Sequence, residues 1–204
     1  MPYYKEPNIL FVHIPKTGGT VIESKLKGKY KQSLYSGFGN NKLPSPFNKK
    51  SLQHQKYTTL YDYRDKLNID FNNIKAFTVV RNPYDRVISD LIWHRVLKKQ
   101  HTKSDVYKLI CKYIKGINVR DYHHVAQYKY VTDKKGNLIP SIIIFKTENL
   151  NKQNNNLNKQ LGVNINIKQN DVNKNYSKYL NADSIKLINK YYAKDFTLFK
   201  YKKR

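Results

Sequence analysis

Short, mostly apolar runs alternate along the chain with segments in which apolar residues recur at helical spacing. The apolar runs span 9–14, 75–81 and 142–145. Their β-branched and aromatic residues are typical of strands that are buried on both faces of a parallel sheet. Helical spacing follows in segments at 21–27, 83–99, 104–115 and 181–195. This order predicts an α/β fold, a single domain over 1–204 with a mainly parallel central sheet flanked by helices.

Capping residues mark the starts of the predicted helices. Asn82 suits an N-cap and Pro83 suits the first helical position. Thr20 and Glu23 have the spacing of a capping box. The two later helices are expected to be capped by Ser104 and Asn181.

The remaining segments carry weaker signals. Residues 28–56 are rich in Gly, Ser, Asn, Pro and Lys, which indicates a long loop. Residues 128–139 have the pattern of a β-hairpin, and the Asn-rich segment 150–161 is either a helix or a loop. The basic tail at 200–204 is expected to be frayed.

Composition adds a strong charge bias. Among 204 residues there are 39 Lys and Arg against 14 Asp and Glu, a formal net charge of +25. This balance excludes an acidic disordered chain and indicates polyanionic partners, which include nucleic acid, an anionic glycan, a membrane surface or a phosphate-rich cofactor. Many of the lysines are also expected simply to form solvated faces.

Cysteine content and hydropathy bear on the compartment. The single Cys111 cannot form an internal disulfide. No apolar run reaches the length of a membrane span, and the first residues lack the features of a signal peptide. We therefore expect a soluble intracellular protein, cytoplasmic as the chain stands, with no membrane partner.

The first candidate site is the octet His13-Ile-Pro-Lys-Thr-Gly-Gly-Thr20, between a predicted strand and a predicted helix. Its glycines allow close approach of a ligand, and the helix N-terminus attracts an anion. Lys16 and the hydroxyls of Thr17 and Thr20 add donors. Because the lysine precedes the glycines, the octet is not a Walker motif.

The second candidate site runs from Val80 to Ser89. Arg81 ends a strand, at the edge of an open α/β sheet where ligands gather. A strand-to-helix turn can bring Arg81 and Ser89 to one phosphate, for which arginine is a forked and permanent cation. Arg86 shares the helix face of Ser89 and is a possible further contact.

Together, His13-Ile-Pro-Lys-Thr-Gly-Gly-Thr20 and Val80-Arg-Asn-Pro-Tyr-Asp-Arg-Val-Ile-Ser89 resemble the sulfotransferases that use 3′-phosphoadenosine 5′-phosphosulfate (PAPS), especially the carbohydrate branch. This resemblance implies a P-loop-kinase-like fold and an enzyme that transfers a sulfuryl group to a hydroxyl, leaving PAP. The sequence of this chain differs from the family pattern at Lys146, where the family often has Arg.

The resemblance also implies residue roles. Lys16 would stabilise the bridging oxygen of the leaving group, and the amides of residues 17–20, with Gly18 and Gly19 among them, would hold the 5′-phosphate. Arg81 and Ser89 would hold the 3′-phosphate and so select PAPS over ATP. A weaker point of resemblance adds Gln127 as a possible contact to the nucleotide or substrate. Independently of the resemblance, Lys174 and Lys178 are possible contacts that would close over the nucleotide.

A general base must accept the proton of the acceptor hydroxyl. His54 is the first candidate, because the resemblance places the base in this region, and Glu23 is the alternative. His13 is expected to make a structural hydrogen bond. His123 and His124 are interpreted as surface residues, and because no group of His, Cys and carboxylate residues has the sequence spacing of a metal site, we expect no metal.

Two other functional classes remain open at this point. One is a nucleotide kinase or NTPase of related α/β fold, against which the lysine position argues. The other is a non-enzymatic protein that binds nucleic acid or heparin through its charge, although no nucleic-acid module is recognisable. Within the sulfotransferase interpretation the acceptor is a carbohydrate, with a tyrosine hydroxyl or a small alcohol next.

Overall fold

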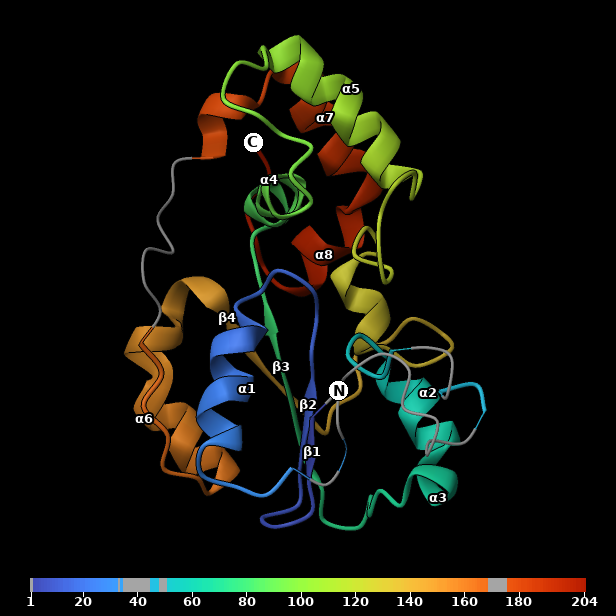
Figure 1. Cartoon of the computed structure of the whole chain (residues 1–204), viewed down its shortest axis with the longest axis vertical. Coiled ribbons are helices and arrows are strands. Elements are labelled where there is room, and N and C mark those ends of the chain that lie inside the picture. Colours follow the sequence, from blue (N-terminus) through green and yellow to red (C-terminus); the bar gives the residue numbers. More distant parts are fainter. Residues whose placement is uncertain (1, 33, 35–44, 48–50, 169–175) are drawn as a thin grey trace. The chain divides into compact units, whose positions relative to one another are not determined.

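The computed structural model describes residues 2–32, 34, 45–47, 51–168 and 176–204 (Figure 1). Two compact units make up the chain. Unit 1 comprises Met1–Val80 and Lys129–Val172, and unit 2 comprises Arg81–Tyr128 and Asn173–Arg204. Each unit is therefore built from two separate stretches of sequence.

Unit 1 contains a four-stranded sheet in the order β1-β2-β3-β4, formed by Tyr3–Tyr4, Ile9–Val12, Lys75–Val80 and Ile142–Lys146. The last three strands are parallel, with Phe11 beside Phe77 and Phe77 beside Ile143, whereas β1 pairs antiparallel with β2. The three predicted strands are thus confirmed. The two-residue β1 was not predicted because it is too short to show a periodicity.

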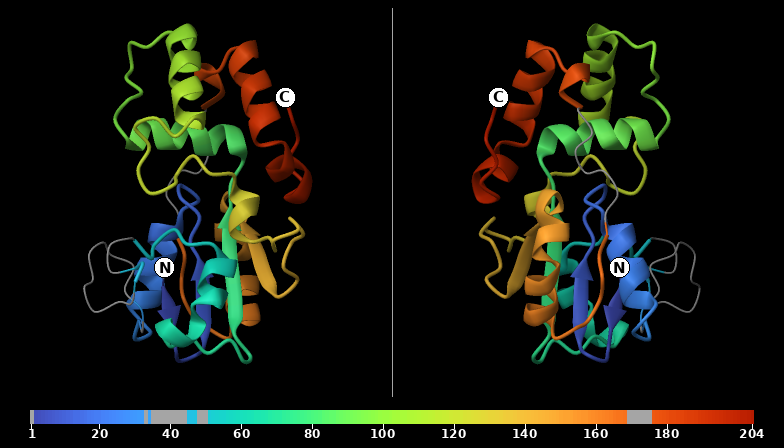
Figure 2. Two further views of the ribbon diagram at one scale, coloured as in Figure 1. Left: turned by 90° about the vertical axis from the view of Figure 1, so that its right-hand side faces the viewer. Right: turned by 90° about the vertical axis from the view of Figure 1, so that its left-hand side faces the viewer.

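Helices cover both faces of this sheet. Helices α1 (Gly19–Lys27) and α6 (Leu150–Leu161) lie on one face, and α2 (Tyr57–Asp62) and α3 (Arg64–Leu67) lie on the other (Figures 1 and 2). Leucines of α6 are buried in the core between α6 and the sheet. The apolar burial explains why the Asn-rich segment is a helix, a choice that its composition left open.

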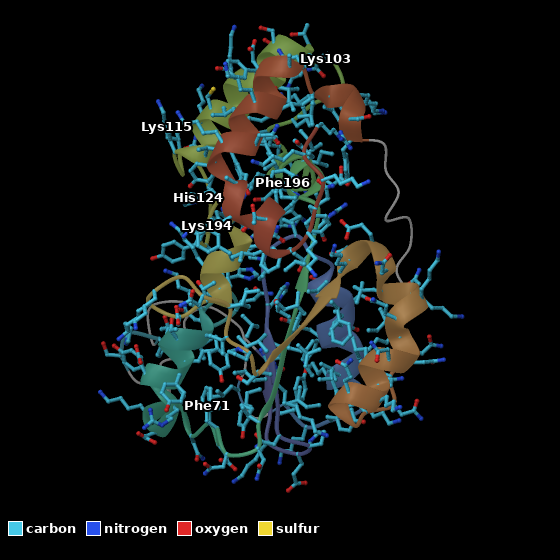
Figure 3. All side chains as sticks on the ribbon, turned by 180° about the vertical axis from the view of Figure 1, so that it is seen from behind. Phe71, Lys103, Lys115, His124, Lys194 and Phe196 are labelled. Carbon is cyan, nitrogen blue, oxygen red and sulfur yellow. The ribbon has the colours of Figure 1, made fainter. Side chains whose placement is uncertain are left out.

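Unit 2 is helical. It contains α4 (Pro83–Trp93), α5 (Lys103–Ile114), α7 (Ala182–Tyr191), α8 (Ala193–Leu198) and the 3₁₀ turn η3 (Tyr176–Tyr179). Their apolar faces form one core, which includes Phe196, while Lys103 and Lys115 are exposed at the two ends of α5 (Figure 3). Among the described residues, no helix combines the length and apolarity that crossing a bilayer requires.

Of the three caps predicted for the helices of unit 2, two are confirmed and one is wrong. The side chain of Asn82 accepts a hydrogen bond from the backbone of Tyr84, and that of Asn181 accepts one from Ser184. Helix α5 is capped by Thr102 instead of Ser104. Thr102 forms a reciprocal capping box with Asp105, and this pair of hydrogen bonds moves the helix start to Lys103.

Three further expectations are corrected. Helix α4 ends at Trp93, before the expected 99, because Arg95 has a left-handed backbone with φ 59°. The expected hairpin at 128–139 is instead the 3₁₀ turn η1 (Gln127–Tyr130) followed by a turn with one isolated bridge. The tail is held to unit 2, where the Arg204 backbone N–H donates to the Tyr84 hydroxyl at 2.8 Å.

Candidate functional site

The loop between β2 and α1 has an unusual backbone. Gly18 is left-handed with φ 86°, which glycine adopts without strain. Lys16 is also left-handed, with φ 65°, and a lysine pays for this conformation with steric strain. Strained non-glycine residues persist where the surrounding structure enforces them, commonly at ligand sites. Lys16 is one of nine described non-glycine residues with a left-handed backbone, and it is the one that lies in the predicted anion-binding loop.

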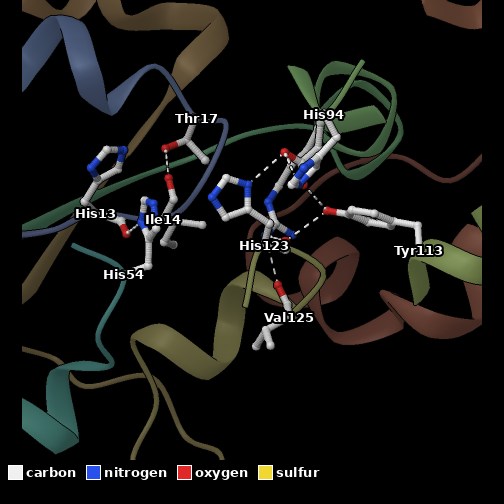
Figure 4. A network of polar contacts seen from close by, with 10 residues as sticks. His13, Ile14, Thr17, His54, His94, Tyr113, His123 and Val125 are labelled. Carbon is white, nitrogen blue, oxygen red and sulfur yellow. Dashed lines mark hydrogen bonds and ion pairs between the residues drawn. The ribbon is translucent and has the colours of Figure 1, made fainter. Parts of the chain in front are cut away.

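Thr17 braces this loop from inside. Its buried hydroxyl donates to the Ile14 carbonyl at 2.9 Å, as Figure 4 shows. The Thr147 hydroxyl lies 2.7 Å from the Thr17 carbonyl oxygen and 3.0 Å from that of Val80, so it ties the loop to the end of β3. The Thr17 hydroxyl, expected to face a ligand, is therefore used within the loop, while Thr20 is exposed.

Gly19 makes room for an imidazole. A Cβ at position 19 would lie 2.2 Å from both Cδ2 and Nε2 of His13, which no real contact tolerates. The sequence suggested that both glycines serve close approach of a ligand. In the structure Gly19 instead allows His13 to pack against the first turn of α1, and Gly18 provides the turn.

The His13 ring is held by Glu23. The two side chains are 2.6 Å apart between Nδ1 and Oε1, so Nδ1 donates to the carboxylate. The predicted capping box of Thr20 and Glu23 is therefore wrong. Gly18 is the N-cap of α1 and makes no side-chain hydrogen bond, and Glu23 contacts His13, the residue after β2, instead. The structural hydrogen bond expected of His13 is confirmed.

His54 joins the same cluster. Its ring lies edge-on to that of His13, with centroids 4.8 Å apart, and its Nδ1 is 3.0 Å from the His13 carbonyl oxygen (Figure 4). A carbonyl can only accept, so Nδ1 carries the proton and, in the neutral ring, Nε2 holds the lone pair. This tautomer is the one that a general base acting through Nε2 requires.

Arg81 begins unit 2 and is held through its backbone. Gln127 Oε1 accepts from the Arg81 N–H at 2.8 Å, and Gln127 Nε2 donates to the Arg81 carbonyl at 2.8 Å. The Arg81 guanidinium lies over the ring of Tyr176, 5.6 Å from its centroid. Gln127 is fully buried and holds the Arg81 backbone, while the ligand contact that the sequence suggested for it stays a prediction.

Asp195 supports Gln127 in turn. Its carboxylate accepts from the backbone N–H groups of Gln127 and Tyr128 at 2.9 and 2.8 Å. Burial raises the pKa of the Asp195 carboxyl above its ordinary value, and these hydrogen bonds oppose that shift. A chain of buried hydrogen bonds thus runs from α8 to the Arg81 backbone.

Arg86 has an internal role. Its guanidinium is 1% exposed and donates to the carbonyls of His123 and Val125 at 2.6 and 2.9 Å. It anchors the segment that precedes η1, while the nucleotide contact expected of Arg86 stays a prediction. Ser89 is half-buried on the same helix, and Lys178 is exposed, 5.2 Å from the Tyr179 ring centroid. Lys174 lies outside the described residues.

Sequence reasoning missed a cluster in unit 2. Asp90, His94 and His123 place one potential metal-ligand atom each within 4.8 Å of the others. His123 is 5% exposed, so its interpretation as a surface residue is wrong. The i,i+4 spacing of Asp90 and His94 on α4 is a visible signal in the sequence, but nothing in the sequence shows that His123 returns to them.

The neighbours of the Asp90 carboxylate lower its pKa. Burial raises the pKa of Asp90, but hydrogen bonds from His123 and Tyr113 and the positive charges of His123 and Arg86 outweigh it, leaving the pKa below its ordinary value. Asp90 is therefore a carboxylate at neutral pH.

The parallel strands of the chain and the loop between β2 and α1 fit a P-loop-like fold. No curated protein matches the sequence. A family model does, over residues 3–202, which span both units. By this match the chain belongs to the sulfotransferase family, the family that its two motifs resemble.

Proposed function

We propose that this sulfotransferase transfers the sulfuryl group of PAPS to a hydroxyl of a carbohydrate. The observation that carries the proposal is Lys16, a lysine held in a left-handed backbone directly after β2 and before the N-terminus of α1. Such a turn offers backbone N–H groups to an anion, and the lysine adds a charge at the same place.

The loop is assigned the 5′-phosphosulfate end of the cofactor. The backbone amides of Gly19 and Thr20 belong to the first turn of α1, where N–H groups have no partner within the helix, and those of Thr17 and Gly18 directly precede it. The Thr17 and Thr147 hydrogen bonds fix the loop before the ligand arrives. A preformed anion site of this kind needs little reorganisation on binding.

Arg81 and Ser89 are assigned the 3′-phosphate. ATP lacks this group, so a contact to it distinguishes PAPS from ATP. The Gln127 clamp supports the assignment, because it fixes the Arg81 backbone and restricts the directions that the guanidinium can take. Exposed Lys178 is a further candidate for contact with the nucleotide.

His54 is assigned the role of general base in preference to Glu23. Glu23 is engaged by His13, and its carboxylate serves to orient that ring. The His13 carbonyl then fixes His54 with its basic nitrogen at Nε2. Glu23 and His13 act as positioning residues in this arrangement.

The reaction is an in-line displacement at sulfur. The acceptor oxygen forms the new S–O bond while its proton passes to His54 Nε2. The bond between sulfur and the bridging oxygen of the 5′-phosphate breaks, and PAP leaves with the electron pair. The Lys16 ammonium stabilises the charge that develops on that oxygen. These steps require position and charge, and no covalent intermediate.

A cleft in unit 1 supports a carbohydrate acceptor. Its volume is about 580 Å³, and α2, which begins three residues after His54, forms one wall. Tyr57 and Tyr61 of α2 line the cleft, together with Lys134 and Lys135 from the turn that follows η1. Aromatic faces with polar groups at their edges are suited to sugar rings, which have both apolar faces and hydroxyls.

The test is transfer from PAPS labelled with ³⁵S to an array of glycans, peptides and small alcohols. We expect a glycan to be labelled, and label to be lost with Lys16→Ala but kept with Lys25→Ala, an exposed lysine on α1. Labelling of tyrosine peptides or small alcohols alone would overturn the carbohydrate assignment.

Two further outcomes would replace the proposal. If ATP with Mg²⁺ protects the protein from melting and PAP does not, the kinase or NTPase interpretation holds. If the protein binds heparin or nucleic acid with a steep salt dependence, and neither PAP nor Lys16 affects it, the chain is a polyanion-binding protein.

A further inference from the structure

We propose that Asp90, His94 and His123 of unit 2 form a binding site for a divalent transition-metal ion. Asp90 and His94 lie one turn apart on α4, and His123 comes from the segment before η1. Figure 4 shows the two imidazoles converging near Tyr113. This site uses none of the residues assigned to PAPS, so it stands or fails independently of the proposed function.

The spacing of the ligand atoms fits one small ion. Asp90 Oδ1 is 2.8 Å from His123 Nδ1 and 3.8 Å from His94 Nε2. In a tetrahedral zinc site with bonds of about 2.0 to 2.1 Å, neighbouring ligand atoms are about 3.3 Å apart. These two distances lie on either side of this value and all three ligand atoms lie within 4.8 Å of one another, so the side chains would rotate to admit the ion.

The surroundings hold the ligands in place. The Tyr113 hydroxyl donates to Asp90 Oδ2 at 2.7 Å, which leaves Oδ1 directed toward the histidines. Arg86 fixes the backbone carbonyl of His123, and the Trp93 ring stacks on the His123 ring with centroids 5.1 Å apart. Hydrogen bonds to the ligands from an outer layer are typical of protein metal sites.

The chemistry of the ligands selects the class of ion. Two imidazoles and one carboxylate favour zinc and related transition ions over Mg²⁺ and Ca²⁺, which prefer oxygen ligands. The positive charge of Arg86 acts on Asp90 and therefore weakens the binding of any cation there. Only an ion that binds imidazole strongly is expected to overcome this repulsion. A small cavity of about 50 Å³ reaches the cluster at His94 and is also lined by Tyr113.

Such an ion would join α4 to an irregular segment. Between α5 and η1 the backbone is left-handed at Asn118, Asp121 and Tyr122, three non-glycine residues. The metal would fix the end of this segment at His123, four residues before the Gln127 clamp on Arg81. We therefore infer a structural site, which stabilises unit 2 and does not take part in sulfuryl transfer.

The test is titration of the untagged, chelator-treated full-length protein with Zn²⁺ by calorimetry. We expect one ion per chain and a rise in melting temperature on binding. His94→Ala should weaken binding by about a hundredfold or more, while His101→Ala, which removes a histidine of unit 2 outside the cluster, should not change it.

A second measurement covers the case in which a variant fails to fold. Co²⁺ bound to the unaltered protein should give the visible absorption of a four-coordinate site, and Zn²⁺ should abolish it. Absence of stoichiometric Zn²⁺ binding, or equal loss of binding in His94→Ala and His101→Ala, would show that the cluster is only a hydrogen-bonded network and would overturn the proposal.

Discussion

Both units bury histidines, but they hold them in different ways. In unit 1 His54 Nδ1 contacts the backbone carbonyl of His13, which leads into the loop that holds Lys16 in a left-handed backbone. In unit 2 His123 is fixed by the carboxylate of Asp90, which Tyr113 also contacts. The carbonyl sets the tautomer of His54, whereas His123 belongs to a buried network around a charged carboxylate.

From this difference we expect one set of residues to matter mainly for transfer and the other mainly for stability. Substitutions of Lys16 or His54 should change transfer more than folding, because the proposed function assigns both residues to the reaction. Substitutions of Asp90, His94 or His123 should change the free energy of unfolding more than the rate of transfer, because each of these buried polar groups depends on its neighbours. The following variants are designed to break or sharpen this contrast.

Lys16→Ala should have the largest effect on transfer. We expect kcat to fall by about a thousandfold, since one electrostatic contact to developing charge is typically worth that much. Lys16→Gly should lose the same activity while gaining about 1 kcal/mol in the free energy of unfolding, because glycine relieves the left-handed strain. Labelled transfer and urea unfolding measure the two effects, and a destabilised Lys16→Gly would contradict the account.

His54→Asn should come next. The asparagine amide preserves the donor to the His13 carbonyl but removes the base at Nε2. We expect transfer to fall about a hundredfold with PAP affinity unchanged. Glu23→Gln should lose less, because it acts through the orientation of His13. A larger loss for Glu23→Gln than for His54→Asn would make Glu23 the base.

Arg86→Met should instead reduce stability. The change leaves the buried carbonyls of His123 and Val125 without their donor and Asp90 without a nearby cation. We expect unfolding free energy to fall by about 3 kcal/mol. Arg120→Met, at an exposed position, is the matched control. Equal stability of both variants would remove the contrast between the units.

The local parts of the fold were predictable from sequence, and the parts that depend on distant partners were not. The parallel strands and the caps at Asn82 and Asn181 follow from local patterns, and the structure confirms them. Glu23 was assigned to a cap because the sequence does not show that His13 competes for it. Likewise, Asp90 and His123 are separated by 33 residues, and only the fold joins them.

Asp105→Asn should have the smallest effect, and it should depend on pH. The hydrogen bonds from Thr102 hold the pKa of Asp105 below its ordinary value, so the carboxylate stabilises the fold above the unfolded pKa of about 3.9. The variant should melt slightly earlier than the parent protein at neutral pH. The difference should disappear as pH falls through the lowered pKa, and a difference that grows in acid would contradict the capping role.

Calorimetric titration with PAP in the absence of Mg²⁺ tests the central claim most directly. We predict one PAP bound per chain, with weakened binding in both Lys16→Ala and Arg81→Ala and with no competition from ATP at equal concentration. Failure to bind PAP, or equally strong binding of ATP, would contradict the assignment of the loop and of Arg81 to the two ends of this cofactor.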